Sequence, residues 1–177
     1  MFQRLIKSMA VMAICMATAF AASPTDAKDK VFLKKAAAGG MAEVAFAKIA
    51  LDKSQNQDVR NFAQKMVDDH TKLNDSLKPI ADQLGVEPPA EAPKEAQAKA
   101  EKLKKLDGDA FDKAYIKAMV EDHHKDLAEF TKEEQSTKND ELKAKVSDGR
   151  KTIEEHTAMI DDLAKKNGIP TPKAAAM

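Results

Sequence analysis

The chain has 177 residues, with 29 basic and 29 acidic side chains, and 43% of its residues are hydrophobic. This balance leaves no basic excess to attract nucleic acid or an anionic membrane, so we expect no nucleic-acid partner. Aromatic residues make up only 5% of the chain, which argues against a stacking platform for bases or sugars. The length suits one domain with a single core.

Segment 1–21 is typical of a bacterial export signal. Arg4 and Lys7 precede the apolar run 9–20, which is too short to span a bilayer comfortably, and Ala19 and Ala21 supply a small-x-small cleavage pattern. Removal of Arg4 and Lys7 leaves 27 basic against 29 acidic side chains, a net charge of −2. We expect an exported protein with no transmembrane span in the mature chain, either periplasmic or associated with the outer membrane.

The mature chain, residues 22–177, contains no cysteine, because Cys15 lies in the export signal. Disulfides, thiolate metal sites and a cysteine nucleophile are therefore excluded. No Gly-x-Ser-x-Gly, His-Glu-x-x-His or phosphate-binding glycine loop occurs either. The sequence gives no support for catalysis by a nucleophile and leaves open whether the protein is an enzyme, and the possible partner is another protein of the cell envelope.

Apolar residues recur three or four positions apart over most of the mature chain, which is the helical spacing. Asn56 is a candidate N-cap, and Gly85 and Gly168, each followed by an apolar residue and a proline, are stop signals. The pattern predicts helices over 29–53, 57–84, 94–106, 110–135 and 140–167. We therefore expect an all-α fold, a ferritin-like up-down four-helix bundle whose longer middle connection carries the short helix 94–106.

One motif occurs three times, at 66–70, 119–123 and 152–156. Each copy contains an apolar residue, two acids and a histidine, and each histidine lies on the apolar stripe of its helix. We expect His70, His123 and His156 to point into the core. Segment 68–71 also matches segment 154–157, so the chain looks like a duplicated helical hairpin.

Three core imidazoles form a candidate mononuclear metal site, completed by Glu43 from the stripe of the first helix. Such a set suits iron, zinc, copper or manganese. The predicted metal ligands are Glu43, His70, His123 and His156, and the predicted outer partners of the imidazoles are Asp69, Asp122 and Glu155. A standard di-iron centre is disfavoured, because Val67 and Ile153 stand three residues before two of the histidines where glutamates are needed.

The competing interpretation is a metal-free polar layer. In that layer each histidine bonds to a carboxylate on a neighbouring helix and fixes the register of the helices. The sequence leaves both interpretations open: a metal-binding bundle for storage, buffering or stress protection, and a structural or interaction bundle of the envelope.

Four stretches carry a resemblance to a known family: 32–37, 40–43, 66–71 and 118–123. They resemble a family of exported bacterial proteins known as domain of unknown function four-one-four-two, often labelled outer membrane proteins. The resemblance covers nearly the whole mature chain. It implies a ferritin-like fold and a location in the cell envelope, and it supplies no established activity.

Overall fold

The computed structural model describes residues 24–172, and this part of the chain is entirely helical, without strands. Its helices are α1 (Pro24–Lys53), α2 (Gln57–Gln83), α3 (Lys94–Lys104), α4 (Gly108–Ser136) and α5 (Asp140–Lys166). The prediction of an all-α fold is confirmed. The predicted export signal, with Cys15, lies outside the described residues. Within them, no helix combines the length and apolar character needed to cross a membrane.

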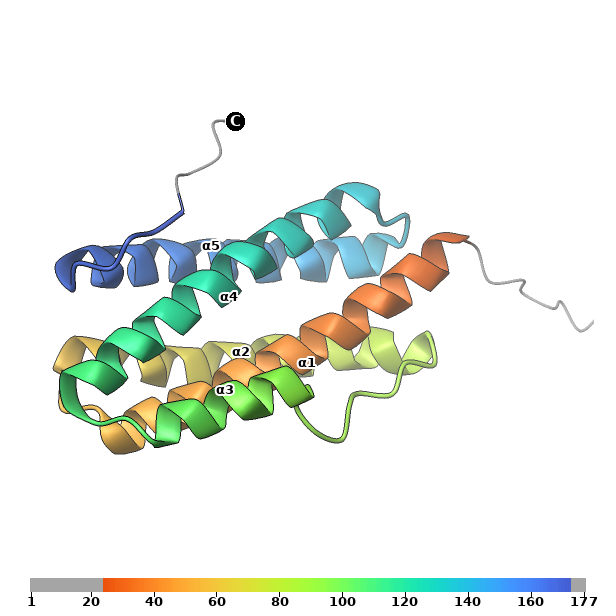
Figure 1. The fold of residues 1–177 in the computed structure, drawn as a ribbon. Helices are drawn as coiled ribbons and strands as arrows, with labels where there is room; N and C mark the ends of the chain where they lie inside the picture. The colour runs from red at the N-terminus through yellow and green to blue at the C-terminus, as the bar shows by residue number, and fades with distance from the viewer. Residues whose placement is uncertain (1–23, 173–177) are drawn as a thin grey trace, which may run out of the picture.

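The four long helices form two hairpins, α1 with α2 and α4 with α5, that pack against each other (Figure 1). Between the hairpins, α1 contacts α4 and α2 contacts α5, whereas the short α3 lies against α1 and α4. The result is a helical bundle in which each long helix presents one face to a common interior.

The ends of the helices follow from local capping residues. The Asn56 side chain accepts hydrogen bonds from the backbone N–H groups of Asp58 and Val59, and Asn139 accepts one from Leu142. Gly85 and Gly168 both have a φ of 67°, a conformation that glycine adopts without steric cost after a helix. Asn56 and Gly85 therefore set the two ends of α2, and Asn139 and Gly168 set the two ends of α5.

The first helix begins earlier than the sequence pattern predicts, at Pro24 instead of about residue 29. Proline suits the first turn of a helix, because its φ is already helical and its missing N–H has no intrahelical partner there. The apolar stripe, which starts only at Phe32, gives no signal for this extra turn.

The two hairpins repeat with a spacing of 83 residues. Asn56 and Asn139 are this far apart, and so are Gly85 and Gly168. The turn contacts repeat as well. Ser54 Oγ donates to Asp112 Oδ1 at 2.6 Å, and Thr137 Oγ1 donates to Asp29 Oδ2 at 3.0 Å, so each turn hydroxyl bonds to an aspartate near the start of the opposite hairpin. These matched contacts support the predicted duplication.

The structural repeat corrects the alignment of the histidine motifs. Segments 68–71 and 154–157 lie 86 residues apart, which is three residues more than the spacing of the caps and turns. In the structural register His70 corresponds to Ile153, and His156 corresponds to Leu73. The similar motifs therefore occupy positions almost one helical turn apart in the two halves.

The core consists of two apolar clusters with the histidines between them along the helices. One cluster includes Phe46, Phe62, Tyr115, Met119 and Ile160. The other includes Phe32, Leu77, Phe130, Val146 and Ile153. On α2, α4 and α5 the histidine follows residues of one cluster and precedes residues of the other, so the imidazoles form a polar layer across the middle of the bundle.

Candidate metal centre

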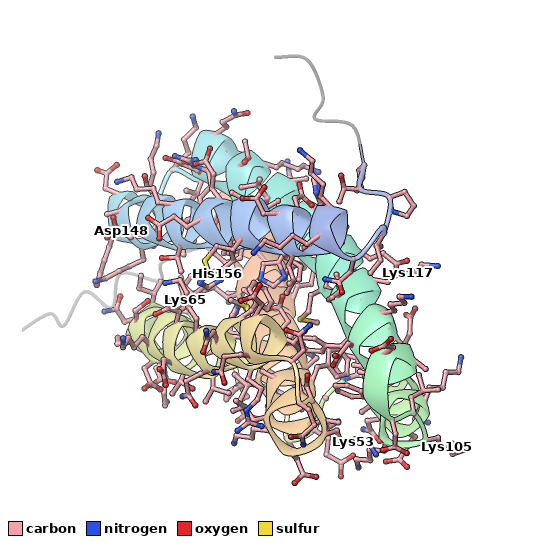
Figure 2. All side chains as sticks on the ribbon, turned by 90° about the vertical axis from the view of Figure 1, so that its left-hand side faces the viewer. Lys53, Lys65, Lys105, Lys117, Asp148 and His156 are labelled. Carbon is pink, nitrogen blue, oxygen red and sulfur yellow. The ribbon has the colours of Figure 1, made fainter. Side chains whose placement is uncertain are left out.

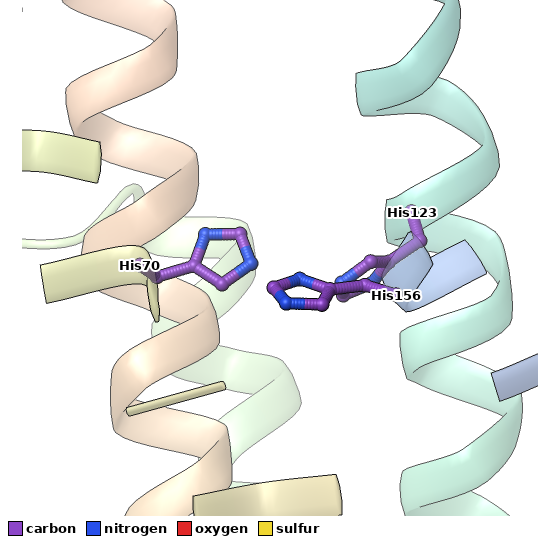
Figure 3. A group of neighbouring side chains, drawn as sticks. All are labelled: His70, His123 and His156. Atoms are coloured by element: carbon purple, nitrogen blue, oxygen red, sulfur yellow. The ribbon is translucent and has the colours of Figure 1, made fainter. Parts of the chain in front are cut away.

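The three motif histidines meet in the interior of the bundle. His70 on α2, His123 on α4 and His156 on α5 are 2%, 0% and 0% exposed. Their ring centroids are 5.3 to 5.6 Å apart, and one nitrogen of each ring lies within 4.8 Å of a nitrogen of each other ring. Figure 3 shows the rings extending toward one another from separate helices. Figure 2 shows Lys53, Lys105 and Lys117 at the periphery, with His156 between the helices.

Two of the rings are oriented by hydrogen bonds on their outer side. His123 Nδ1 lies 3.0 Å from the backbone carbonyl of Met119, and His156 Nε2 lies 3.0 Å from Asp69 Oδ2. A neutral imidazole has one N–H, and the nitrogen that faces an oxygen acceptor must carry it. The N–H is therefore on Nδ1 of His123 and on Nε2 of His156. The nitrogens with a free lone pair are therefore Nε2 of His123 and Nδ1 of His156.

The third ring is held by Glu43, a residue of α1 that is 2% exposed. Glu43 Oε2 lies 3.1 Å from His70 Nδ1, and Oε1 lies 3.2 Å from His123 Nδ1, although neither contact has the alignment of a hydrogen bond. His70 therefore contacts Glu43 through Nδ1 without a hydrogen bond that would fix the position of its N–H.

One ring nitrogen in each of the three histidines has no hydrogen-bond partner. Nε2 of His70, Nε2 of His123 and Nδ1 of His156 are all buried and unpaired, as are both oxygens of Glu43. A buried polar atom without a partner costs about 1 to 3 kcal/mol. A cation bonded to the three nitrogens would remove this cost, because each would then donate its lone pair.

Burial also keeps the imidazoles in the form that binds metals. It lowers the pKa of His70 to about 3, with a further contribution from the nearby His156. Burial lowers the pKa of His123 well below its usual value, and it lowers that of His156 against the opposing effect of Asp69. All three rings are therefore neutral at pH 7, as metal ligation requires.

The two carboxylates beside the rings have opposite pKa shifts. Burial raises the pKa of Glu43 well above its usual value, and the negative charges of Asp126 and Asp122 raise it further. For Asp69, burial alone would raise the pKa, but hydrogen bonds from Lys65 and His156 lower it to about 2. Asp69 is thus a charged acceptor for an imidazole N–H, whereas Glu43 needs a nearby cation to be ionised.

The structure brings five of the seven predicted site residues together: Glu43, Asp69, His70, His123 and His156. The other two predicted partners have different neighbours. Asp122 pairs with Lys99 on α3, at 3.0 and 3.2 Å, and Glu155 is exposed on the outer face of α5. Glu43 contacts the outer, Nδ1 side of two rings, so its predicted role as a metal ligand would require its side chain to turn.

Sequence reasoning overlooked two residues near the centre. Asp126 lines a pocket together with Glu43, and burial followed by the charge of Asp122 raises its pKa to about 7. Its spacing gives a signal, because it lies three residues after His123 and 83 after Glu43. The second is Tyr115, which is buried and whose hydroxyl is unpaired. His124, by contrast, pairs with Asp161 at 3.0 Å outside the centre.

The donor set could hold a transition-metal ion. Three neutral imidazoles are a common ligand set for such ions, and two of the three here are oriented by a hydrogen bond to an outer partner. A tetrahedral ion with bonds of about 2.0 to 2.1 Å needs nitrogens about 3.4 Å apart. One nitrogen of each ring here lies within 4.8 Å of those of the other two rings, so the side chains would have to move closer together to reach this geometry.

Solved structures of two other proteins share the fold. The chain is similar to a DUF305 protein of Streptomyces coelicolor, whose description calls it secreted, with a TM-score of 0.69 and 16% identity over 86% of this chain and 98% of that one. It is also similar to a DUF305 fragment from Deinococcus radiodurans, with a TM-score of 0.70 and 14% identity over 82% of this chain and 98% of that one. At these identities the likeness concerns the fold alone.

No curated protein matches the chain. The sequence pattern of one family does match, over residues 15–163, which include all four long helices except the last few residues of α5. The match contains every histidine of the centre together with Glu43 and Asp69. The chain therefore belongs to the family described as Domain of unknown function (DUF4142).

Proposed function

We propose that the protein binds one divalent transition-metal ion through His70, His123 and His156. The observation that carries this proposal is the set of three buried ring nitrogens, one from each histidine, that have no hydrogen-bond partner. Three imidazole lone pairs cannot satisfy one another, whereas a cation could accept all three. Asp69 and the Met119 carbonyl fix the orientation of two rings, and Glu43 orients the third.

Zinc and copper are the ions that the donor set favours. Imidazole nitrogens suit these ions and also iron, whereas manganese prefers carboxylate and water oxygens. In this proposal Glu43 remains beside the rings, and its negative charge partly neutralises the ion. One coordination position then stays open for water or a small ligand.

We assign the protein a role in the cell envelope, where it would hold metal for storage, buffering or protection against stress. Support comes from the export signal in segment 1–21 and from the structural neighbour in Streptomyces coelicolor, whose description calls it secreted. A ferritin-like four-helix bundle is part of this proposal, and the pairing of four long helices in two hairpins supports it.

A metal-free bundle is the second candidate function, and specific contacts favour it too. Asp69 on α2 bonds to His156 on α5, and Glu43 on α1 contacts rings on α2 and α4. These contacts link all four long helices at one level and would fix their register. In that case the bundle would act by binding another envelope protein.

Elemental analysis separates the two functions. The exported, untagged protein would be purified without chelators and then incubated with zinc or copper, alongside His123→Ala and His124→Ala. The second variant is a matched control, because it removes the adjacent histidine, which pairs with Asp161 outside the centre. We expect about one metal per chain in the wild type and in His124→Ala, and none in His123→Ala.

Two results would contradict the metal site. Retention of the metal by His123→Ala would show that the ion binds elsewhere. Absence of metal from the wild-type protein after incubation would favour the metal-free bundle, and the search would move to binding partners.

A further inference from the structure

A pocket of about 160 Å³ lies next to the histidine centre, between α1, α3 and α4. Its volume is enough for about five water molecules, at roughly 30 Å³ each. Three acidic residues of the long helices line it: Glu43, Asp122 and Asp126. The small residues Gly39 and Ala96 also line the pocket, so there is room beside the carboxylates for a partly hydrated ion.

Glu43 is shared between this pocket and the histidine centre. It lines the pocket, and its two oxygens lie 3.1 and 3.2 Å from the Nδ1 atoms of His70 and His123. The residue is 2% exposed, and neither oxygen accepts a hydrogen bond. An unpaired, buried carboxylate that touches both an acidic pocket and two of the imidazoles is suited to receiving a cation in the pocket and, by turning its side chain, passing the cation to the rings.

Two lysines, Lys99 and Lys125, also line the pocket, and Lys99 pairs with one of its acids. The Lys99 ammonium group lies 3.0 and 3.2 Å from the two oxygens of Asp122, and 5.9 Å from the centroid of the Phe46 ring. Its side chain is about one-third exposed, at 30%. Lys99 belongs to α3, whose only buried side chain is Leu103.

A second pocket, on the other side of the bundle, provides the comparison. It is lined by Asp69, Lys72 and Asp148, among others, and has a volume of about 200 Å³. Its inner carboxylate, Asp69, is already bonded to Lys65 at 2.7 Å and to His156 at 3.0 Å. This side therefore lacks the unpaired acceptor that Glu43 supplies.

We propose that the pocket under α3 is the entrance through which a divalent transition-metal cation reaches the three histidines. In this entrance Asp122 and Asp126 attract the ion, Lys99 competes with it for Asp122, and Glu43 passes it to the imidazoles. The proposal rests on the metal-binding function proposed above and adds the route of uptake.

Stopped-flow mixing of the metal-free mature protein with Co²⁺ tests the entrance, because bound Co²⁺ absorbs visible light. Charged clefts raise association rates by about 10- to 1,000-fold. We therefore expect the double variant Asp122→Asn/Asp126→Asn to bind Co²⁺ at least about tenfold more slowly, with the same final spectrum and stoichiometry. Lys99→Gln should bind it faster, because the competing charge is gone.

Asp148→Asn is the matched control, since it removes an acid from the second pocket. We expect it to bind Co²⁺ at the wild-type rate. An unchanged rate in the double variant, or an equal slowing in Asp148→Asn, would overturn the entrance while the metal centre stands. A wild-type protein that binds no Co²⁺ would instead overturn the metal-binding function itself, so the two failures are distinguishable.

Discussion

The histidine layer and the two ends of the bundle both bury polar groups, but only the ends satisfy them within the protein. At one end Ser54 donates to Asp112, and at the other Thr137 donates to Asp29. In the middle, three ring nitrogens remain unpaired. Burial of polar groups alone therefore does not indicate a binding site. Buried polar groups that cannot form hydrogen bonds with one another do indicate one.

The end of the bundle that contains Asp29 also has two unpaired oxygens, and a single proton shared between their carboxyl groups gives both a hydrogen-bond partner. Oδ1 of Asp29 and Oε1 of Glu133 are buried without a partner if both carboxyl groups are ionised. Burial and the hydrogen bond with Asp29 raise the pKa of Glu133 to about 7. A protonated Glu133 therefore donates to Asp29, and the pair satisfies itself.

The histidine layer has no such solution. The N–H of His123 bonds to Met119, and that of His156 bonds to Asp69. Protonation of the free nitrogens is unfavourable, because burial lowers the pKa of each ring. A bound cation is one way to satisfy all three.

The largest expected effect is stabilisation of the histidine layer by metal. A ligand at 100 times its Kd raises the free energy of unfolding by about 2.7 kcal/mol. We expect about this increase for the wild-type protein with zinc in urea denaturation, and no increase for His156→Ala. Equal stabilisation of the variant would place the zinc outside the layer.

Two matched substitutions compare how the histidine layer and one end of the bundle contribute to zinc affinity. Loss of the outer partner of a metal-binding histidine typically reduces metal affinity by about 10- to 100-fold. We expect a loss of this size for Asp69→Asn, because the amide is a weaker acceptor for His156 than the carboxylate. Asp112→Asn removes the charge beside Ser54 and should leave the affinity unchanged. Titration calorimetry with zinc measures both, and equal losses would refute the distinction between the two regions.

The smallest expected effect concerns the carboxyl pair. The pKa of Glu133 is raised from 4.5 to about 7, so between these values the folded state holds a proton that the unfolded state has lost. Its contribution to stability is complete below about pH 4.5 and is lost as the pH rises through about 7. One pKa unit corresponds to about 1.4 kcal/mol, and water near the end of the bundle reduces the effect to about 1 kcal/mol in total.

Glu133→Gln removes this titration and keeps an N–H donor for Asp29. Between pH 5 and pH 8 the wild-type protein should therefore lose about 1 kcal/mol of stability relative to the variant. Urea denaturation at the two pH values measures the difference. A difference that stays constant with pH would show that the two carboxyl groups share no proton.

Most of the fold could be predicted from the sequence, because its helices end at residues with a local preference for caps. Asn56, Gly85 and Gly168 gave the ends of the predicted helices to within one residue, since their signals act over a few positions. The start of α1 was predicted five residues late. Its first turn, which begins at Pro24, lies outside the apolar stripe.

The candidate site was predictable only in part, because its geometry depends on the offsets between helices. Burial of the three histidines followed from the stripe, and Asp69 was correctly placed beside an imidazole. Asp122 was predicted to be the outer partner of an imidazole, but it pairs instead with Lys99 of α3. Spacing within one helix cannot reveal a contact that a separate helix supplies.

The 83-residue repeat has a consequence for how such a centre can arise. An assembly of two identical hairpins related by a twofold axis can offer an ion on that axis only an even number of equivalent donors. Here His123 corresponds to Gly40, His70 to Ile153 and His156 to Leu73, so none of the three donors has a counterpart in the other half. An odd donor set of this kind requires two halves that differ in sequence, and joining both halves in one polypeptide lets each half diverge independently.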